Sequence, residues 1–425
     1  MDAGVLTSIG SEVASAVDQA RLWSRHMDLA AFGRRTDGGV NRQALSGEDI
    51  AARKQLISWA EELGYRVFTD AVGNLFIRRE GQRPELAPIM TGSHLDSQPA
   101  GGKFDGVFGV LAGMEVLQAL DACNIVTDRP IEVVVWTNEE GSRFSPGMTG
   151  SLAFAGQLDP KDMMTIADES GVCFGEALAD VEKVFADLPR RPLGFPVSCY
   201  IEAHIEQGPV LEKANCNIGI VSGIQGTRWF TVTVTGKAMH AGTVPSRMRK
   251  DAFRGALSMI NALSEIMIDK EDIIRFTIGR VVVQPNSPNT IPGSVTFTVD
   301  FRHPDPVVLS LLGDQVVRIC RENAGECGID IQETLTSPPI TFPSWIVEKI
   351  ANTAQALGMP NMVLPSGAFH DALSMSTICP TGMIFVPCAE GISHSPEEKA
   401  EPDALAAGAR VLAATIAEIA SSSEP

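Results

Sequence analysis

Residues 131–141 read IEVVVWTNEEG, and this segment decides the fold class. Its first six residues are β-branched or aromatic almost without interruption, as expected for a parallel strand that is buried on both faces. Polar residues and a glycine follow at once. The same order of strand, polar loop and helix precedes it, with strands predicted at 74–79 and 88–93 and a small-residue helix at about 106–122. The repetition predicts an α/β sandwich with polar residues at the carboxyl ends of its strands.

The pattern changes near residue 222. It then predicts strand 229–235, helix 250–267, strands 273–283 and 294–302, helix 306–324 and strand 329–334. This β-α-β-β-α-β order is that of a ferredoxin-like unit. The α/β pattern returns at about residue 342 and ends in an Ala-rich helix from about residue 403. We therefore expect an α/β domain made of residues 1–222 and 337–425, with a second domain inserted at 223–336.

The composition limits the partners and the compartment. The formal net charge is −18, and Lys and Arg form no long runs, which disfavours nucleic acid as a partner. An anionic substrate would then need a local positive site. The eight cysteines show no Cys-x-x-Cys spacing and indicate reduced thiols. Neither a signal-peptide pattern nor an apolar segment of membrane-spanning length is evident, so we expect a cytoplasmic protein without a membrane partner.

Candidate metal ligands occur in five separate Gly-rich or acidic segments. They are His94 in GSHLDS, Asp105 in GGKFDG, Glu139 and Glu140 in TNEEG, His204 in HIEQG and His394 in SHS. A lone histidine is usually structural, but together these residues offer enough imidazoles and carboxylates to hold two divalent cations. Asp105 is the best bridge, because its flanking glycines allow close approach and the adjacent helix start favours an anion. The alternative is that Asp105 only caps that helix.

The paired glutamates suggest a division of roles. One carboxylate can bind metal while the other accepts a proton from activated water, since a bound metal lowers the pKa of water from 15.7 to about 7. The alternative is two solvated glutamates in a loop. Asp96, two residues after His94, would be a carboxylate that orients the imidazole. The sequence therefore predicts metal-assisted hydrolysis.

Three further residues have less specific surroundings. His240, in GKAMHAG, lies in the inserted domain and could reach a carbonyl oxygen after domain closure, or could be a locally bonded loop histidine. Arg302 could pair with a substrate carboxylate or lie on the surface. His370 opens a helix after SGAF and could be a metal ligand, a residue supporting one, part of a pocket wall or a cap.

Several segments in the same order resemble one family over nearly the whole chain. They are GSHLDSQPAGGKFDG, TNEEGSRF, HIEQGP, GKAMHAGTVP, DFRH and SGAFHDA. They are similar to the amidase, hydantoinase/carbamoylase branch of the aminoacylase-type dinuclear metallohydrolases. That branch contains N-carbamoyl-L-amino acid hydrolases, β-ureidopropionases of the yeast type and allantoate amidohydrolases.

The resemblance implies a role for each motif residue. It implies two divalent ions per subunit, zinc or manganese with cobalt or nickel as further options, held by His94, Glu140, His204 and His394 and bridged by Asp105, with Glu139 as general base. It also implies substrate contacts by Gln207, His240, Asn289 and Arg302, and a pocket lined by Gly367 and Ala368. The inserted domain of the family usually dimerises, which implies a homodimer in which His240 acts in the partner subunit's site.

The resemblance implies hydrolysis of a small carboxylate substrate, an N-carbamoyl-L-amino acid or N-carbamoyl-β-alanine. Allantoate amidohydrolase is the nearest alternative, and Gln98-Pro99 favours the carbamoyl compounds. An aminoacylase or dipeptidase is disfavoured, because exopeptidase relatives tend to have a carboxylate where this chain has His204. A catalytically silent binding protein is disfavoured because every expected position is filled. The chain departs from the family at Phe369, where glycine is frequent, and at Val244 and Ser246.

Overall fold

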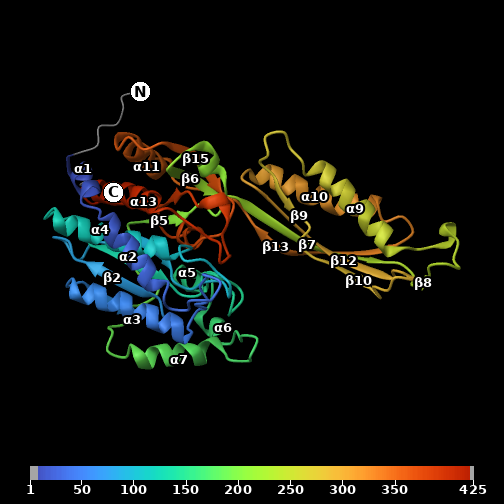
Figure 1. The fold of residues 1–425 in the computed structure, drawn as a ribbon, viewed down its shortest axis with the longest axis horizontal. Helices are drawn as coiled ribbons and strands as arrows, with labels where there is room; N and C mark the ends of the chain where they lie inside the picture. Colours follow the sequence, from blue (N-terminus) through green and yellow to red (C-terminus); the bar gives the residue numbers. More distant parts are fainter. Residues whose placement is uncertain (1–7, 422–425) are drawn as a thin grey trace. The chain divides into compact units, whose positions relative to one another are not determined.

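The chain divides into two units, Met1–Ser222 with Phe342–Pro425, and Gly223–Thr341. The computed structural model describes residues 8–421, and Figure 1 shows the elements of each unit. The second division falls after residue 341, whereas the sequence analysis placed it after 336. Part of the difference arises because β13 spans Gly328–Ser337 and so runs three residues past the predicted end at 334.

The first unit is built on a nine-stranded sheet in the order β1-β2-β4-β3-β5-β16-β6-β14, with β15 paired to β6. Its strands are β1 Arg66–Thr69, β2 Leu75–Arg79, β3 Ile89–His94, β4 Ile131–Trp136, β5 Cys199–Ile205, β6 Ile218–Ile224, β14 Ile340–Thr341, β15 Asn361–Ser366 and β16 Thr381–Val386. Its helices are α1 Ser8–Ser15, α2 Gln19–Leu29, α3 Gly47–Glu62, α4 Val107–Ala122, α5 Thr149–Phe154, α6 Pro160–Met164, α7 Phe174–Val184, α8 Val210–Ala214, α11 Ser344–Ala356, α12 Asp371–Met375 and α13 Pro402–Ala420. A short 3₁₀ turn, η2, spans Ala389–Gly391. The edge strand β14 and the last two residues of β6 fall within the residue range of the second unit.

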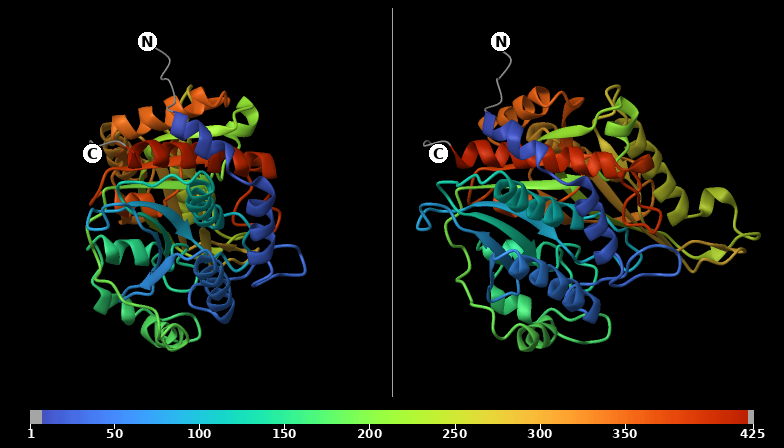
Figure 2. Two further views of the ribbon diagram at one scale, coloured as in Figure 1. Left: turned by 90° about the vertical axis from the view of Figure 1, so that its left-hand side faces the viewer. Right: turned by 60° about the vertical axis from the view of Figure 1, so that its left-hand side comes forward.

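Every residue of β4 is buried, and successive side chains of a strand point to opposite faces, so both faces of the sheet are covered at this strand. On β4, Ile131, Val133 and Val135 join the main hydrophobic core with residues of α4 and α13, which run side by side (Figures 1 and 2). Trp136 belongs to the other face, where its ring meets Phe154 of α5 at 5.3 Å. The predicted sandwich is thus confirmed.

Strand β4 pairs with one parallel and one antiparallel neighbour. β4 runs parallel to β3 but antiparallel to β2, so the prediction of a parallel strand holds on one side only. β3, β5 and β16 run parallel to one another. Helix α4 packs tightly on β5: a Cβ at Gly109 would lie 2.4 Å from the carbonyl oxygen of Ala203. The carboxyl ends of β3, β4 and β5 therefore lie at the same edge of the sheet.

The second unit has the predicted ferredoxin-like arrangement. Its main sheet has the order β10-β12-β7-β13, with β9 also paired to β12, and β8 and β11 form a separate two-stranded ribbon. The strands are β7 Gly226–Thr235, β8 Met239–His240, β9 Arg275–Thr277, β10 Val281–Gln284, β11 Thr290–Ile291, β12 Ser294–His303 and β13 Gly328–Ser337. Its helices are α9 Ala252–Ile266 and α10 Pro306–Glu322, with a 3₁₀ turn, η1, at Ser246–Met248. The predicted single strand at 273–283 is two strands, β9 and β10.

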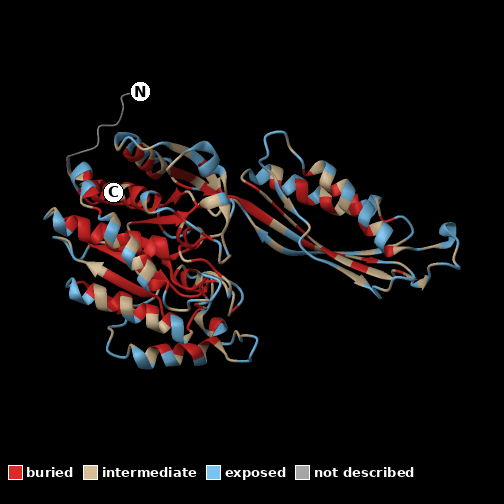
Figure 3. Cartoon of the chain, in the orientation of Figure 1, coloured by how far each residue is buried: buried red, intermediate tan, exposed pale blue. Residues whose placement is uncertain are grey.

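Helices α9 and α10 supply the core of this unit. Their buried residues, including Met259 and Val316, cluster with alternate residues of β12 such as Phe297 and Val299. Figure 3 shows the buried side of each helix turned towards the sheet. Asp251 caps α9 by accepting hydrogen bonds from the amides of Phe253 and Arg254. Among the described residues 8–421, no helix combines the length and apolar character needed to cross a membrane.

Candidate metal centre

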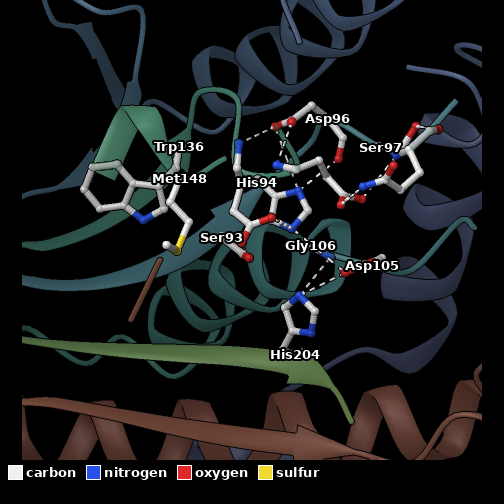
Figure 4. A network of polar contacts seen from close by, with 12 residues as sticks. Ser93, His94, Asp96, Ser97, Asp105, Gly106, Trp136, Met148 and His204 are labelled. Carbon is white, nitrogen blue, oxygen red and sulfur yellow. Dashed lines mark hydrogen bonds and ion pairs between the residues drawn. The ribbon is translucent and has the colours of Figure 1, made fainter. Parts of the chain in front are cut away.

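The predicted ligands converge at the carboxyl ends of adjacent strands. His94 is the last residue of β3, His204 lies near the end of the neighbouring β5, and Glu139 and Glu140 follow β4. Asp105 ends the loop that leads into α4. Figure 4 shows the rings of His94 and His204 on either side of the Asp105 carboxylate. The architecture, rather than proximity in sequence, brings these side chains together.

One group of candidate ligands consists of His94, Asp105 and His204, all buried. The Nε2 atom of His204 lies 3.1 Å from Asp105 Oδ1, and that of His94 lies 3.9 Å from the same oxygen. The Nδ1 atom of each ring contacts a main-chain oxygen at 2.9 Å, that of Asp96 for His94 and that of Ile205 for His204. A carbonyl can only accept, so Nδ1 carries the proton and Nε2 is the atom available to a cation.

A second group consists of Asp105, Glu140 and His394. The Nε2 atom of His394 lies 3.2 Å from Asp105 Oδ2 and 3.3 Å from Glu140 Oε2. The two oxygens of Asp105 are therefore divided between the two groups. This is the arrangement expected of a bridging carboxylate. The alternative that Asp105 caps α4 is wrong, because the cap residue is Gly106 and no side chain caps the helix.

The electrostatics of both groups favour a bound cation. Burial opposes the charged form of His204, but its hydrogen bond to Asp105 and the charge of that carboxylate outweigh burial and raise the pKa of His204 to about 9. The hydrogen bond to Asp105 raises the pKa of His394 to about 9 as well. Burial, followed by the nearby Asp105, raises the pKa of Glu140 to about 8. The raised pKa values mean that His204, His394 and Glu140 bind protons readily at the positions where metal ions would bind.

The donor set therefore fits divalent metal ions. It combines imidazole nitrogens with carboxylate oxygens, which suits zinc, manganese, cobalt and nickel. Buried carboxylates at this density are costly unless a cation compensates them. Two residues of the site, Gln207 and His394, also hold positive φ angles of 57° and 54°, a strained backbone that clusters at functional sites.

Glu139 lies beside the first ligand group. Its Oε2 atom is 3.5 Å from His94 Nε2, and burial, followed by the charge of Asp371, raises its pKa well above the ordinary value. The preceding Asn138 has a φ of 57° and donates from its side chain to the carbonyl oxygen of Phe144 at 2.7 Å. This turn directs Glu139 towards the ligands instead of towards solvent.

A profile of Peptidase family M20/M25/M40 matches residues 90–418, which include all of these ligands. The chain belongs to this family.

The similarity extends over almost the full length of individual relatives. An N-carbamoyl-L-amino-acid amidohydrolase from Rhizobium meliloti is 37% identical over 95% of this chain and 97% of its own length. An allantoate amidohydrolase from Escherichia coli is 33% identical, with coverages of 95% and 98%. The solved structure of a hydantoinase/carbamoylase family amidase from Burkholderia multivorans is 42% identical with a TM-score of 0.89, covering 96% of this chain and 98% of that one. The resemblance to this branch of the M20 family is confirmed.

Within this M20 enzyme, Asp96 acts through two different groups. Its main-chain oxygen holds the His94 ring, while its carboxylate accepts hydrogen bonds from the amides of Glu139 at 3.3 Å and Glu140 at 3.1 Å. The carboxylate oxygen is 3.9 Å from His94 Nδ1, beyond hydrogen-bond distance. Asp96 therefore links the His94 loop to the paired glutamates, a role that the sequence analysis did not foresee.

His370 packs on the outer side of His204. The two rings are 4.5 Å apart, and His370 Nε2 contacts Ser366 Oγ at 3.0 Å. Glu202 lies in the same buried group and accepts hydrogen bonds from Ser93 Oγ and the amide of Ala372. Because Nδ1 of His204 is directed to Ile205, this group supports the ring instead of forming another cation site.

Residues 366–368 form a tight turn at the end of β15. The Ser366 hydroxyl contacts both the amide and the carbonyl oxygen of Ala368, at 3.1 and 2.9 Å. Gly367 lies between them and is exposed. Gly367 and Ala368, the two residues predicted to line the pocket, therefore lie in this turn.

Gln207 contacts the ligands instead of pointing away from them. Its Nε2 atom donates to Asp105 Oδ2 at 2.9 Å and lies 3.2 Å from Ser393 Oγ. The sequence analysis assigned Gln207 to the substrate, and the structure places it next to the Asp105 carboxylate. Gln98 was not identified as a site residue, yet its side chain donates to Glu140 Oε2 at 2.7 Å. Only its position in the His94 motif hinted at this contact.

The second unit brings two of its three predicted site residues together. His240 on β8 pairs with Thr290 on β11, and the carbonyl oxygen of Asn289 accepts from the amide of Ala241 at 2.9 Å. Arg302 lies on β12, eight residues beyond Ser294, where its guanidinium contacts Asp300 at 3.0 Å. At about 3.3 Å per strand residue, Arg302 is therefore about 26 Å along the strand from the end that adjoins β11.

Proposed function

We propose that this M20 enzyme is a dinuclear metal-dependent amidohydrolase that removes the carbamoyl group of N-carbamoyl-L-amino acids or N-carbamoyl-β-alanine. The products would be the amino acid, ammonia and carbon dioxide. The observation that carries the proposal is the division of the two Asp105 oxygens between two ligand groups beside Glu139. The relatives' names support the choice of a ureido substrate.

Two ions would be held, one by His94, Asp105 and His204 and the other by Asp105, Glu140 and His394. Bound zinc or manganese, with cobalt or nickel as alternatives, supplies Lewis-acid activation of water and of the ureido carbonyl. Glu139 accepts the proton of the attacking water and delivers it to the nitrogen that leaves. Its buried position raises its proton affinity, which suits a group that must both take up and release a proton.

The substrate carboxylate would be bound mainly by Arg302, whose planar guanidinium can form two parallel hydrogen bonds to it. Asn289 and Gln207 would complete this contact, while His240 would stabilise the oxyanion that develops on the carbonyl. An amino acid derivative is much shorter than the separation of about 26 Å along β12. This separation supports a homodimer in which His240 and Asn289 serve the partner subunit's site and Arg302 serves its own.

The test of the general base is Glu139→Gln in protein reconstituted with Mn²⁺ or Zn²⁺. Ammonia release is measured on N-carbamoyl-L-amino acids, N-carbamoyl-β-alanine and allantoate, and free amine on an N-acetyl amino acid. We expect turnover of carbamoyl compounds by the wild type, a loss of at least 10²-fold on substitution, and unchanged metal content. A variant that keeps substantial activity would refute the role of Glu139, and turnover of the acetyl compound alone would exclude a carbamoylase.

The test of the homodimer is complementation between two inactive variants. His240→Ala and Arg302→Met each disable every site of their own dimers. In a mixed dimer, one site receives both substitutions and the other receives neither, so mixing should restore activity towards half that of the wild type per mixed dimer. Mixtures that stay inactive after confirmed subunit exchange would show that both residues act in the same subunit.

Allantoate amidohydrolase remains the second candidate, favoured by the Escherichia coli relative. Activity confined to allantoate in the same panel would select it. We also propose a cytoplasmic location, because all eight cysteines are free thiols and none is placed in a disulfide.

A further inference from the structure

Glu398 is a buried carboxylate next to the candidate metal centre but outside both ligand groups. It lies four residues after His394 and only 4% of its surface is exposed. One oxygen, Oε1, accepts hydrogen bonds from the amides of Phe104 at 2.8 Å and Asp105 at 3.1 Å. The other, Oε2, accepts from Ser393 Oγ at 2.9 Å. Both oxygens are therefore used.

The main-chain amides of Phe104 and Asp105 lie outside helices and strands, so no regular secondary structure provides their hydrogen-bond acceptors. They belong to the Gly-rich loop that ends at α4, and the helix itself begins without a side-chain cap. Buried main-chain amides need an acceptor, and a carboxylate that accepts from both holds the loop in one conformation. The space is closely fitted, because a Cβ at Gly102 would lie 2.1 Å from the Glu398 carboxyl carbon. Glycine at this position is what allows the carboxylate to enter.

The same carboxylate also holds the segment that carries His394. Ser393, the neighbour of His394, contacts Glu398 through its hydroxyl, which lies 3.1 Å from Asp105 Oδ2. Glu398 thus connects two loops that supply ligands from positions almost three hundred residues apart. The positions of His94 and His204 do not depend on Glu398, because these residues lie on the paired strands β3 and β5.

We propose that Glu398 is a positioning residue that sets the separation of Asp105 and His394. It thereby strengthens binding of the ion shared by Asp105, Glu140 and His394. The inference rests on the proposed dinuclear centre. Loss of Glu398 should weaken the binding of this ion most. The other ion also has Asp105 as a ligand, but its two histidines, His94 and His204, are held by strands. Substitutions of residues that orient metal ligands typically lower affinity by about 10–100-fold.

The experiment compares Glu398→Ala, Glu398→Gln and the matched control Glu397→Gln with the wild type. Glu397 is the adjacent, exposed glutamate and undergoes the same chemical change. Stepwise affinities for Zn²⁺ or Co²⁺ are measured by chelator competition, together with metal content, the absorption spectrum of the Co²⁺ protein and the thermal unfolding temperature. No substrate is needed, so the result does not depend on which compound the enzyme cleaves.

We expect Glu398→Ala to lose about 10–100-fold in the affinity of the ion shared with His394. The other ion should lose less, because it shares Asp105 but keeps His94 and His204. Glu398→Gln should lose less, because its amide oxygen can still accept from the two amides, and Glu397→Gln should match the wild type. Equal weakening of both ions, or wild-type affinity for both in Glu398→Ala, would overturn the proposal while leaving the dinuclear centre intact. A wild type that binds fewer than two ions would overturn the centre itself and this proposal with it.

Discussion

Replacing Gly106 by alanine removes no functional group, yet it should disrupt the metal centre. Gly106 has φ 67° and ψ −46°, a conformation that side-chain-bearing residues rarely adopt. An added Cβ would lie 2.4 Å from Cε1 and Nε2 of His94, whereas ordinary contacts are at about 3.5 Å. The ring of His94 would therefore have to move by about 1 Å, far more than the tolerance of about 0.2 Å for a metal–ligand distance.

The cost has two parts. The positive φ with negative ψ, a sparsely populated conformation for an L-residue, costs about 1–3 kcal/mol, and the contact with a buried ring adds about 1–3 kcal/mol. Gly64→Ala is the matched control, because Gly64 has φ 81° and nothing within 4 Å of its Cβ position. Gly64→Ala should show the cost of a positive φ without the contact, and the protein should keep its metal.

The assay is thermal unfolding together with metal content after dialysis. At roughly 2–4 °C per kcal/mol for a domain of a few hundred residues, Gly106→Ala should unfold several degrees below Gly64→Ala and bind less metal. If the two variants unfold at the same temperature and hold equal metal, the reasoning about contact with His94 is wrong.

Two further predictions concern protons and a buried guanidinium. In the metal-free protein, His204 and His394 have pKa values raised to about 9, so the folded state holds more protons than the unfolded state between about pH 6.5 and 9. Their contribution to stability should fall as pH rises through this window while metal affinity rises, and a metal-free unfolding temperature that rises instead would contradict this. The buried Arg42 donates to the main-chain oxygens of Leu29, Phe32 and Leu95 at 2.8, 3.0 and 2.7 Å. Arg42→Met should cost about 3–5 kcal/mol in chemical denaturation, and a loss below 1 kcal/mol would show that these oxygens find other donors.

Local sequence predicted most elements well, because their patterns carry the physical cause of the structure. The helix expected at 250–267 is Ala252–Ile266, with Asp251 as its cap. The strand expected at 273–283 was less accurate, since β9 and β10 pair with different parts of β12. The mixed neighbours of β4 were also not predicted, because buried parallel and antiparallel strands share the same apolar pattern.

The candidate ligands were predictable because their chemistry depends on residue type and on short motifs. Their supporting contacts were not. Asp96 holds the glutamate pair through its carboxylate and His94 through its main chain, and Gln98 holds Glu140. No spacing in the sequence distinguishes these arrangements, because each depends on how two loops approach one another.

The sequence by itself determined the two-unit α/β architecture, the acidic character and the set of imidazoles and carboxylates available to metal ions. Strand and helix periodicity are local properties, and so is the presence of a histidine at the end of a strand. Only the tertiary structure decided that Asp105 gives one oxygen to each ligand group and that Glu398 joins the loops of Asp105 and His394. The contacts of Asp105 with His394 and with Glu398 join residues almost three hundred positions apart. Packing of the sheet and its loops, not local preference, brings them within hydrogen-bond distance.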